Sequence, residues 1–183
     1  YRLLGWAQLC AGGAGLKKVL TTLVTFTSGS STNSTNTVGT LANSITPQSD
    51  LTITYFSRAI IAFANQDASN DRSVNLMMGF LIKAAAIISK ASRDGRKVYR
   101  NDISPSACVG ITDCVTNGAA CTNVNMSDAD ANDFLTTINS AGSSVTASFG
   151  SLGSLTSSLV SQLPAGAAAN TVRCVIVNSL LRE

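Results

Sequence analysis

Apolar residues recur at steps of three and four along most of this chain, which is the spacing of one face of an α-helix. The clearest series lies in residues 145–163 and consists of Val145, Phe149, Leu152, Leu155, Leu159 and Leu163. Similar spacing predicts a helix near each end of the chain. One lies within Leu3 to Thr27, interrupted at Gly12–Gly13, and one lies within Ala167 to Leu181.

The segment from Pro47 to Asp67 allows two interpretations at its start, because Leu51 and Ile53 alternate with threonines as in a β-strand. Further on, the apolar residues keep helical steps, and the segment is longer than a typical strand. We therefore expect a helix here.

The segment from Ser69 to Asp94 is apolar on nearly every side, which is typical of a central helix with neighbours all round it. Asn70 or Ser69 can cap its start, and Gly95 can end it. Its most apolar part is shorter than the ~18 residues of a membrane-spanning helix and carries Lys83, so we expect no membrane span. The whole pattern predicts an all-α fold, a compact bundle of about five to seven helices in a single domain over residues 1–183.

Two long loops are expected between these helices. Residues 28–46 are rich in Ser, Thr and Asn and predict a flexible loop, and residues 101–126 predict a Cys-rich loop. The cysteines lack the close pairing of zinc sites and the chain has no His, so disulfides that staple the bundle are expected instead, with their pairing left open. The five cysteines are Cys10, Cys108, Cys114, Cys121 and Cys174.

The polar surface must be mostly neutral, because charged residues make up 13% of the chain while Ser, Thr and Asn number 24, 19 and 14. Disulfides and such a surface favour an extracellular, secreted protein. Asn33 and Asn125 begin N-x-[ST] sequons and are candidate glycosylation sites. Because Tyr1 does not open a leader pattern, we expect any signal peptide to have been removed.

Catalysis is not expected, since the chain lacks His and its one Glu is Glu183. No residue spacing proposes a nucleophile with its base, and no cofactor is implied. A calcium loop begins at Asp128, Asp130 and Asn132 but lacks the glycine and the late glutamate that such a loop needs. A helix capped by Ser127 explains these acids better, with Gly142 as its expected end.

A basic cluster follows the central helix: Lys90, Arg93, Arg96, Lys97 and Arg100. The net charge is only +3 and few aromatic residues accompany the cluster, so nucleic acid is not the expected partner. A solvated helix end is the simpler explanation, and an anionic glycan or an acidic partner comes next.

The segment from Ser157 to Leu181 joins a Ser/Val/Leu helix, a small-residue break and a cysteine in the next apolar helix. In this it resembles the last helices of spider-silk terminal domains. The remainder of the chain departs from that pattern in its dense Cys loop and its lack of repeats, so no family is assigned. The resemblance implies a role for Cys174 at a contact between subunits.

Two functions fit these features. The first is a secreted structural subunit that self-assembles as a homo-oligomer or polymer, forming a filament, fibre or coat. One of Cys10 and Cys174 should lie at a contact between copies. The expected contact is the last helix, flanked by Arg173 and Arg182, which would pair with carboxylates of a second copy. The contact residues are Val172, Cys174, Ile176 and Leu180. The alternative is an extracellular helical protein that binds a lipid or other hydrophobic ligand in a cavity lined by Phe63, Met77, Met78 and Phe80.

Overall fold

The computed structural model describes residues 1–14, 21, 42, 49–91, 126–144 and 150–176, and within them it contains six helices. The all-α class is therefore confirmed for this part of the chain. Of the two predicted loops, 28–46 and 101–126, all but Ala42 and Met126 lie outside the described residues. The helices are α1 (Arg2–Ala11), α4 (Asp50–Ala64), α5 (Asn70–Lys90), α8 (Asp128–Ser144), α9 (Gly150–Gln162) and α10 (Ala169–Val175).

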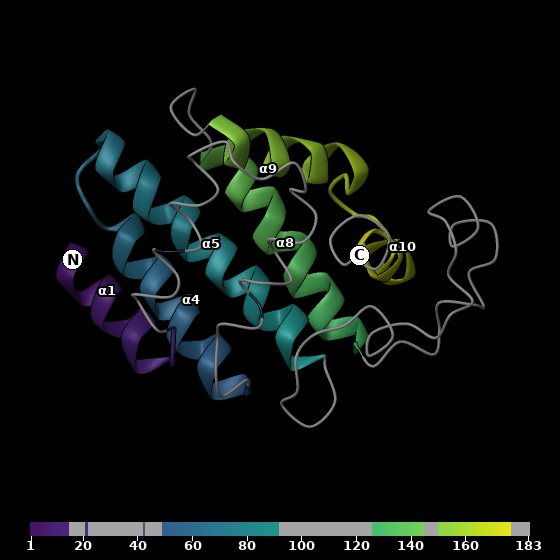
Figure 1. Cartoon of the computed structure of the whole chain (residues 1–183), viewed down its shortest axis with the longest axis horizontal. Helices are drawn as coiled ribbons and strands as arrows, with labels where there is room; N and C mark the ends of the chain where they lie inside the picture. The colour runs from purple at the N-terminus through teal and green to yellow at the C-terminus, as the bar shows by residue number, and fades with distance from the viewer. Residues whose placement is uncertain (15–20, 22–41, 43–48, 92–125, 145–149, 177–183) are drawn as a thin grey trace.

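Four helices pack in chain order, with α1 against α4, α4 against α5, and α5 against α8, while α9 and α10 both pack on α8 (Figure 1). Helix α5 is therefore enclosed between α4 and α8, and α1 has an outer position beside α4. Helices α1 and α4 run in opposite directions, because Gly5 lies against Phe63 whereas Gly12 lies against Phe56.

Helix α4 settles the ambiguity at its start in favour of a helix. Ser49 caps it, since its Oγ accepts a hydrogen bond from the backbone N of Thr52 at 3.3 Å. A strand would bury Leu51 and expose Thr52, whereas here Leu51 is exposed and Thr52 is buried. The helical steps further along the segment decide which residues face the core.

Helix α5 is the centre of the fold, as its all-round apolarity predicts. Between Met77 and Ser89, every residue except Phe80 and Lys83 is buried. Ser69 caps the helix through a 3.1 Å hydrogen bond from the backbone N of Arg72. Among the described helices, this one is long and apolar enough to cross a membrane, but 67% of its apolar window is buried inside the fold, as in a core helix.

Helix α1 packs closely on α4 because it presents glycines to aromatic rings. A Cβ added at Gly5 would lie 2.2 Å from the Phe63 ring, closer than van der Waals contact allows. The Trp6 ring meets the same phenylalanine edge to face, with ring centroids 5.6 Å apart. The helix ends at the predicted break, where Gly13 adopts a φ of 85°.

The expected end of α8 at Gly142 is wrong, because the helix continues to Ser144. A Cβ at Gly142 would lie 2.7 Å from Val160 Cγ2, so this glycine allows α9 to approach α8. Its role is close packing between helices. The apolar series of residues 145–163 forms α9 from Gly150 onward, while 145–149 lie outside the described residues.

The described residues contain no disulfide: Cys10 is exposed on α1 and Cys174 is buried in α10. The other three cysteines, Cys108, Cys114 and Cys121, lie outside the described residues. The predicted disulfide staple is therefore not found in this part of the chain, where helix packing alone accounts for the core.

Replacing Gly5 with Ala should lower the free energy of unfolding by about 1–3 kcal/mol, because the added methyl group would overlap the Phe63 ring. Helix propensity alone predicts the opposite sign, a gain of up to about 1 kcal/mol. Urea denaturation measures the difference. The double variant Gly5→Ala/Phe63→Leu should recover part of the loss, and a stabilising effect of Gly5→Ala would show that α1 does not pack here.

Candidate functional site

The start of α8 carries a cluster of carboxylates, with Asp128 and Asp130 in its first turn. Ser127 caps the helix as predicted: its Oγ accepts from the backbone N of Asp130 at 3.1 Å and donates to Asp130 Oδ2 at 2.7 Å. Acids at this end of a helix are stabilised by the helix dipole. Each of these two carboxylates, and that of Asp133 further along, contacts a cation from another helix.

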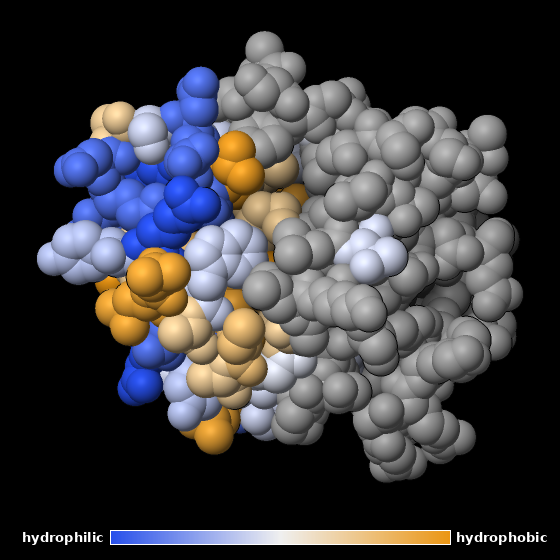
Figure 2. Space-filling model, turned by 60° about the vertical axis from the view of Figure 1, so that its left-hand side comes forward, coloured by the Kyte–Doolittle hydropathy of each residue, from blue (hydrophilic) through white to orange (hydrophobic). Residues whose placement is uncertain are grey.

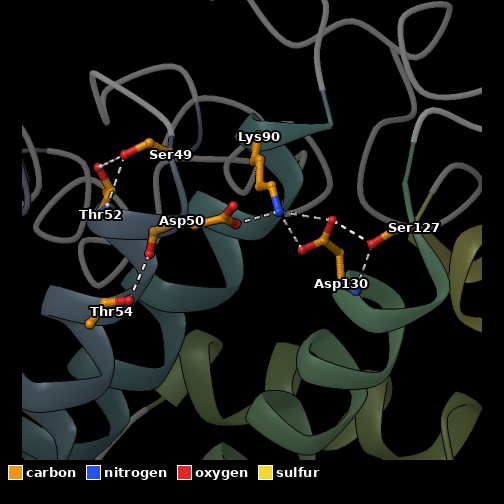
Figure 3. A network of polar contacts seen from close by, with 7 residues as sticks. All are labelled: Ser49, Asp50, Thr52, Thr54, Lys90, Ser127 and Asp130. Carbon is orange, nitrogen blue, oxygen red and sulfur yellow. Dashed lines mark hydrogen bonds and ion pairs between the residues drawn. The ribbon is translucent and has the colours of Figure 1, made fainter.

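Lys90, in the last turn of α5, connects three helices through its ammonium group (Figure 3). Its Nζ lies 2.6 Å from Asp50 Oδ1 at the start of α4 and donates to Asp130 Oδ1 at 2.9 Å. The hydrogen bond to Asp50, followed by that to Asp130, raises the pKa of Lys90 above 10.5, against a smaller opposing effect of burial. This ion-pair network holds the ends of α4, α5 and α8 together.

Lys83 makes a second bridge between α5 and α8. Its Nζ donates to Asp133 Oδ1 at 2.7 Å, and its side chain is mostly buried. The lysine that interrupts the central apolar segment therefore has its charge balanced by a carboxylate of the neighbouring helix.

Arg173 connects α10 to the start of α8 from within the core, where it is 7% exposed. Its Nε donates to the backbone oxygen of Met126 at 2.9 Å, and its two terminal nitrogens donate to Asn170 Oδ1 and Asp128 Oδ1. Arg173 was expected to pair with carboxylates of a second copy, and here each of its three nitrogens donates a hydrogen bond within its own chain instead. Sequence reasoning missed this role because the partners are 45 and 47 residues away.

These contacts account for the charged motifs that the sequence singled out. The calcium interpretation fails because Asp128 and Asp130 contact Arg173 and Lys90. Among the described residues, no group of three His, Cys, Asp or Glu side chains is arranged to hold a metal ion. Of the basic cluster, Lys90 belongs to the network above, and Arg93, Arg96, Lys97 and Arg100 lie outside the described residues.

The expected assembly contact lies in the core of the single chain where it is described. Val172, Cys174 and Ile176 each have no exposed surface, and Leu180 and Arg182 lie outside the described residues. Their apolar spacing is explained by packing inside one chain.

Both candidate glycosylation sites, Asn33 and Asn125, lie outside the described residues. The two residues after Asn125 are described: Met126 is buried, and the Ser127 hydroxyl caps α8. A sequon must be accessible to the enzyme that modifies it.

The surface of α1 is apolar on its outward side, where Cys10, one of the two cysteines expected at a contact between copies, is exposed. Figure 2, which brings the side of α1 and α4 forward, shows hydrophobic residues at the surface beside a hydrophilic area. The sequence of α1 indicates such a surface, because apolar or small residues occupy both faces of the helix and only one face can pack on α4. The outward set, here called the α1 face, is exposed throughout and consists of Leu3, Leu4, Ala7, Cys10 and Ala11.

A shallow pocket of about 360 Å³ lies between α8 and the turn before α10. Three of its polar side chains already donate hydrogen bonds within the chain: Thr136 and Ser143 donate to carbonyls of their own helix, and Asn139 donates to Leu135 and Leu163. No charged side chain lines it. The lining residues are Leu135, Thr136, Asn139, Ser140, Ser143, Ala165 and Gly166.

No protein-family model, no curated protein and no solved structure matches this chain. The likeness to silk terminal domains therefore stays a resemblance of one segment. Function has to be argued from the exposed and buried residues themselves.

The network around Lys90 should weaken at alkaline pH. A group whose pKa is raised by folding stabilises the folded state fully below its unfolded pKa, here 10.5, and this stabilisation is lost as pH rises through the higher folded-state pKa. The free energy of unfolding should therefore fall more steeply above pH 10.5 in the parent than in Lys90→Met. Urea denaturation across this range measures both slopes, with Arg2→Met as a control, and equal slopes in parent and Lys90→Met would contradict the network.

Replacing Arg173 with Lys should lower the free energy of unfolding by about 1–3 kcal/mol, because one ammonium group cannot reach the three acceptors that the guanidinium fork reaches. The matched control is Arg2→Lys, at an exposed ion pair with Asp71. That change should stay within about 0.5 kcal/mol of the parent. Urea denaturation of both variants tests the difference, and similar losses would show that Arg173 has no special structural role.

Proposed function

We propose that this protein is a secreted, glycosylated structural subunit that assembles with copies of itself into a filament, fibre or coat. The α1 face carries this proposal, because Leu3 is 85% exposed and Leu4 is 51% exposed on a helix whose one charged residue is Arg2. Contiguous apolar surface of this kind marks an interaction site. Covering it with another chain removes it from water, which is the main favourable contribution to association.

The low charge of the chain supports the same function. Only 13% of the residues are charged and the net charge is +3, so identical copies repel each other weakly. A surface made polar by Ser, Thr and Asn stays hydrated without charge. Close packing of many identical copies is favoured by both features.

The cysteine count gives further support. Five cysteines cannot all pair within one chain, and an exposed thiol outside the cell tends to oxidise. Cys10 is exposed on the α1 face, where a covering chain would shield it from oxidants. Assembly thus removes both the exposed leucines and the exposed thiol from solvent.

The alternative, an extracellular protein that binds a lipid or other hydrophobic ligand, depends on room among the core side chains. Phe63 is enclosed by Gly5, Trp6 and Gly79, and Met77 is buried. These residues contact one another as packed core side chains. Their contacts favour the structural subunit over the ligand-binding protein.

Purified protein should shift from monomer to larger species as its concentration rises, because the apolar surface is covered only by association. Sedimentation velocity and light scattering over a concentration series measure this shift.

Protein from its native source should also exceed the bare 18.8 kDa mass by the mass of attached sugar. A single monomeric species at every concentration, with lipid recovered by solvent extraction, would replace this function with the ligand-binding alternative.

A further inference from the structure

The α1 face has an uneven distribution of side-chain size. Its large residues, Leu3 and Leu4, lie at the start of the helix, and its small residues, Cys10 and Ala11, lie at the end. Ala7 is midway between the two pairs. With 3.6 residues per turn, the five positions fall within an arc of about 120° and Ala7 is near its centre.

We propose that the α1 face is a two-fold contact between two copies of this chain, with the two α1 helices antiparallel and crossing at Ala7. In this register, Leu3 packs beside Cys10 of the second copy and Leu4 packs beside its Ala11. Each large side chain therefore meets a small one, and the two Ala7 residues face each other. This inference rests on the proposed self-assembly and specifies one of its contacts.

A second copy is the occupant that this pattern fits, because a two-fold contact requires a surface that is complementary to itself. Large residues at one end and small residues at the other give that complementarity only when the helix is paired with its own reverse. A lipid surface would not require small residues at one end. Charge does not oppose the contact, since Arg2, the one charged residue of α1, is paired with Asp71 beside the face.

The size of the contact predicts a weak dimer. One face of a 10-residue helix covers less than the ~800 Å² per partner of a standard interface. The dimer should therefore form only as the protein concentration rises. A two-fold contact also closes on itself, so a filament or coat needs a second, different contact elsewhere on the chain.

The register also decides what happens to Cys10. With the two-fold axis at Ala7, the two Cys10 positions are offset by about 9 Å along the helices, beyond the reach of a disulfide. Cys10 is then covered by Leu3 of the second copy and stays a thiol. This distinguishes the contact from a simple disulfide-linked dimer.

Cysteine cross-linking tests the register directly. In a Cys10→Ser background, Ala7→Cys should give a covalent dimer when dioxygen with copper phenanthroline oxidises the two thiols to a disulfide. Ala11→Cys alone should not, because its two copies are about 12 Å apart along the helices. Adding Leu4→Cys to Ala11→Cys should restore the dimer, because these two positions lie side by side in this register. Non-reducing gels measure all three against Cys10→Ser alone, and equal cross-linking of Ala7→Cys and Ala11→Cys, or none, overturns the register.

Thiol protection gives an independent measurement on the parent. The alkylation rate of Cys10, followed by peptide mass spectrometry, should fall by about tenfold between dilute protein and a concentration at which most chains are paired. Leu4→Ser should abolish this protection, whereas Leu51→Ser, at an exposed leucine of α4, should not. Protection that is the same at every concentration would show that the same chain covers Cys10, and protection only on adding phosphatidylcholine vesicles would show a lipid surface. Either result overturns the proposal.

The same experiments separate this contact from the assembly function. Large assemblies whose mass is unchanged by Leu4→Ser would leave self-assembly standing and overturn the α1 contact. Dimers that cross-link through Ala7→Cys but never grow further would support the contact and overturn the filament or coat.

Discussion

Helix α5 imposes the constraint on which the rest of the structure depends. From Met77 onward it is apolar on nearly every side, so no face of it can be left in water at an acceptable free energy. Helices α4 and α8 cover it from two sides, and α1, α9 and α10 pack on those two helices in turn. The arrangement of the described chain therefore follows from enclosing one helix.

The few charges of the chain mark where these helices meet. Lys83 and Lys90 leave α5 toward carboxylates of α8, and Arg173 leaves α10 toward the start of the same helix. Partly buried charges are stable only when paired, so each lysine or arginine fixes the alignment of its helix against the next. Asp128 and Asp130, which resemble the start of a calcium loop in the sequence, therefore form ion pairs between helices.

Covering the core in this way leaves α1 at the outside, with one face on α4 and its other apolar face exposed. The glycines of α1 face α4 and allow the two helices to pack closely, so Leu3 and Leu4 on the opposite face point outward. The surface proposed for self-association is thus a consequence of how α1 reaches Phe63. The helix that sequence reasoning chose for assembly, α10, is instead occupied within its own chain.

The sequence by itself determined the helical class, the cap at Ser127 and the central position of α5, because periodicity and capping are local properties, while the choice between Ser69 and Asn70 as the cap of α5 was left to the structure. It could not determine which apolar face stays exposed. Val172 and Leu3 both belong to apolar helical patterns, yet one is buried and the other is open to solvent. Only the tertiary structure decided this, because burial depends on which helix packs against which, and those partners lie far apart in the chain.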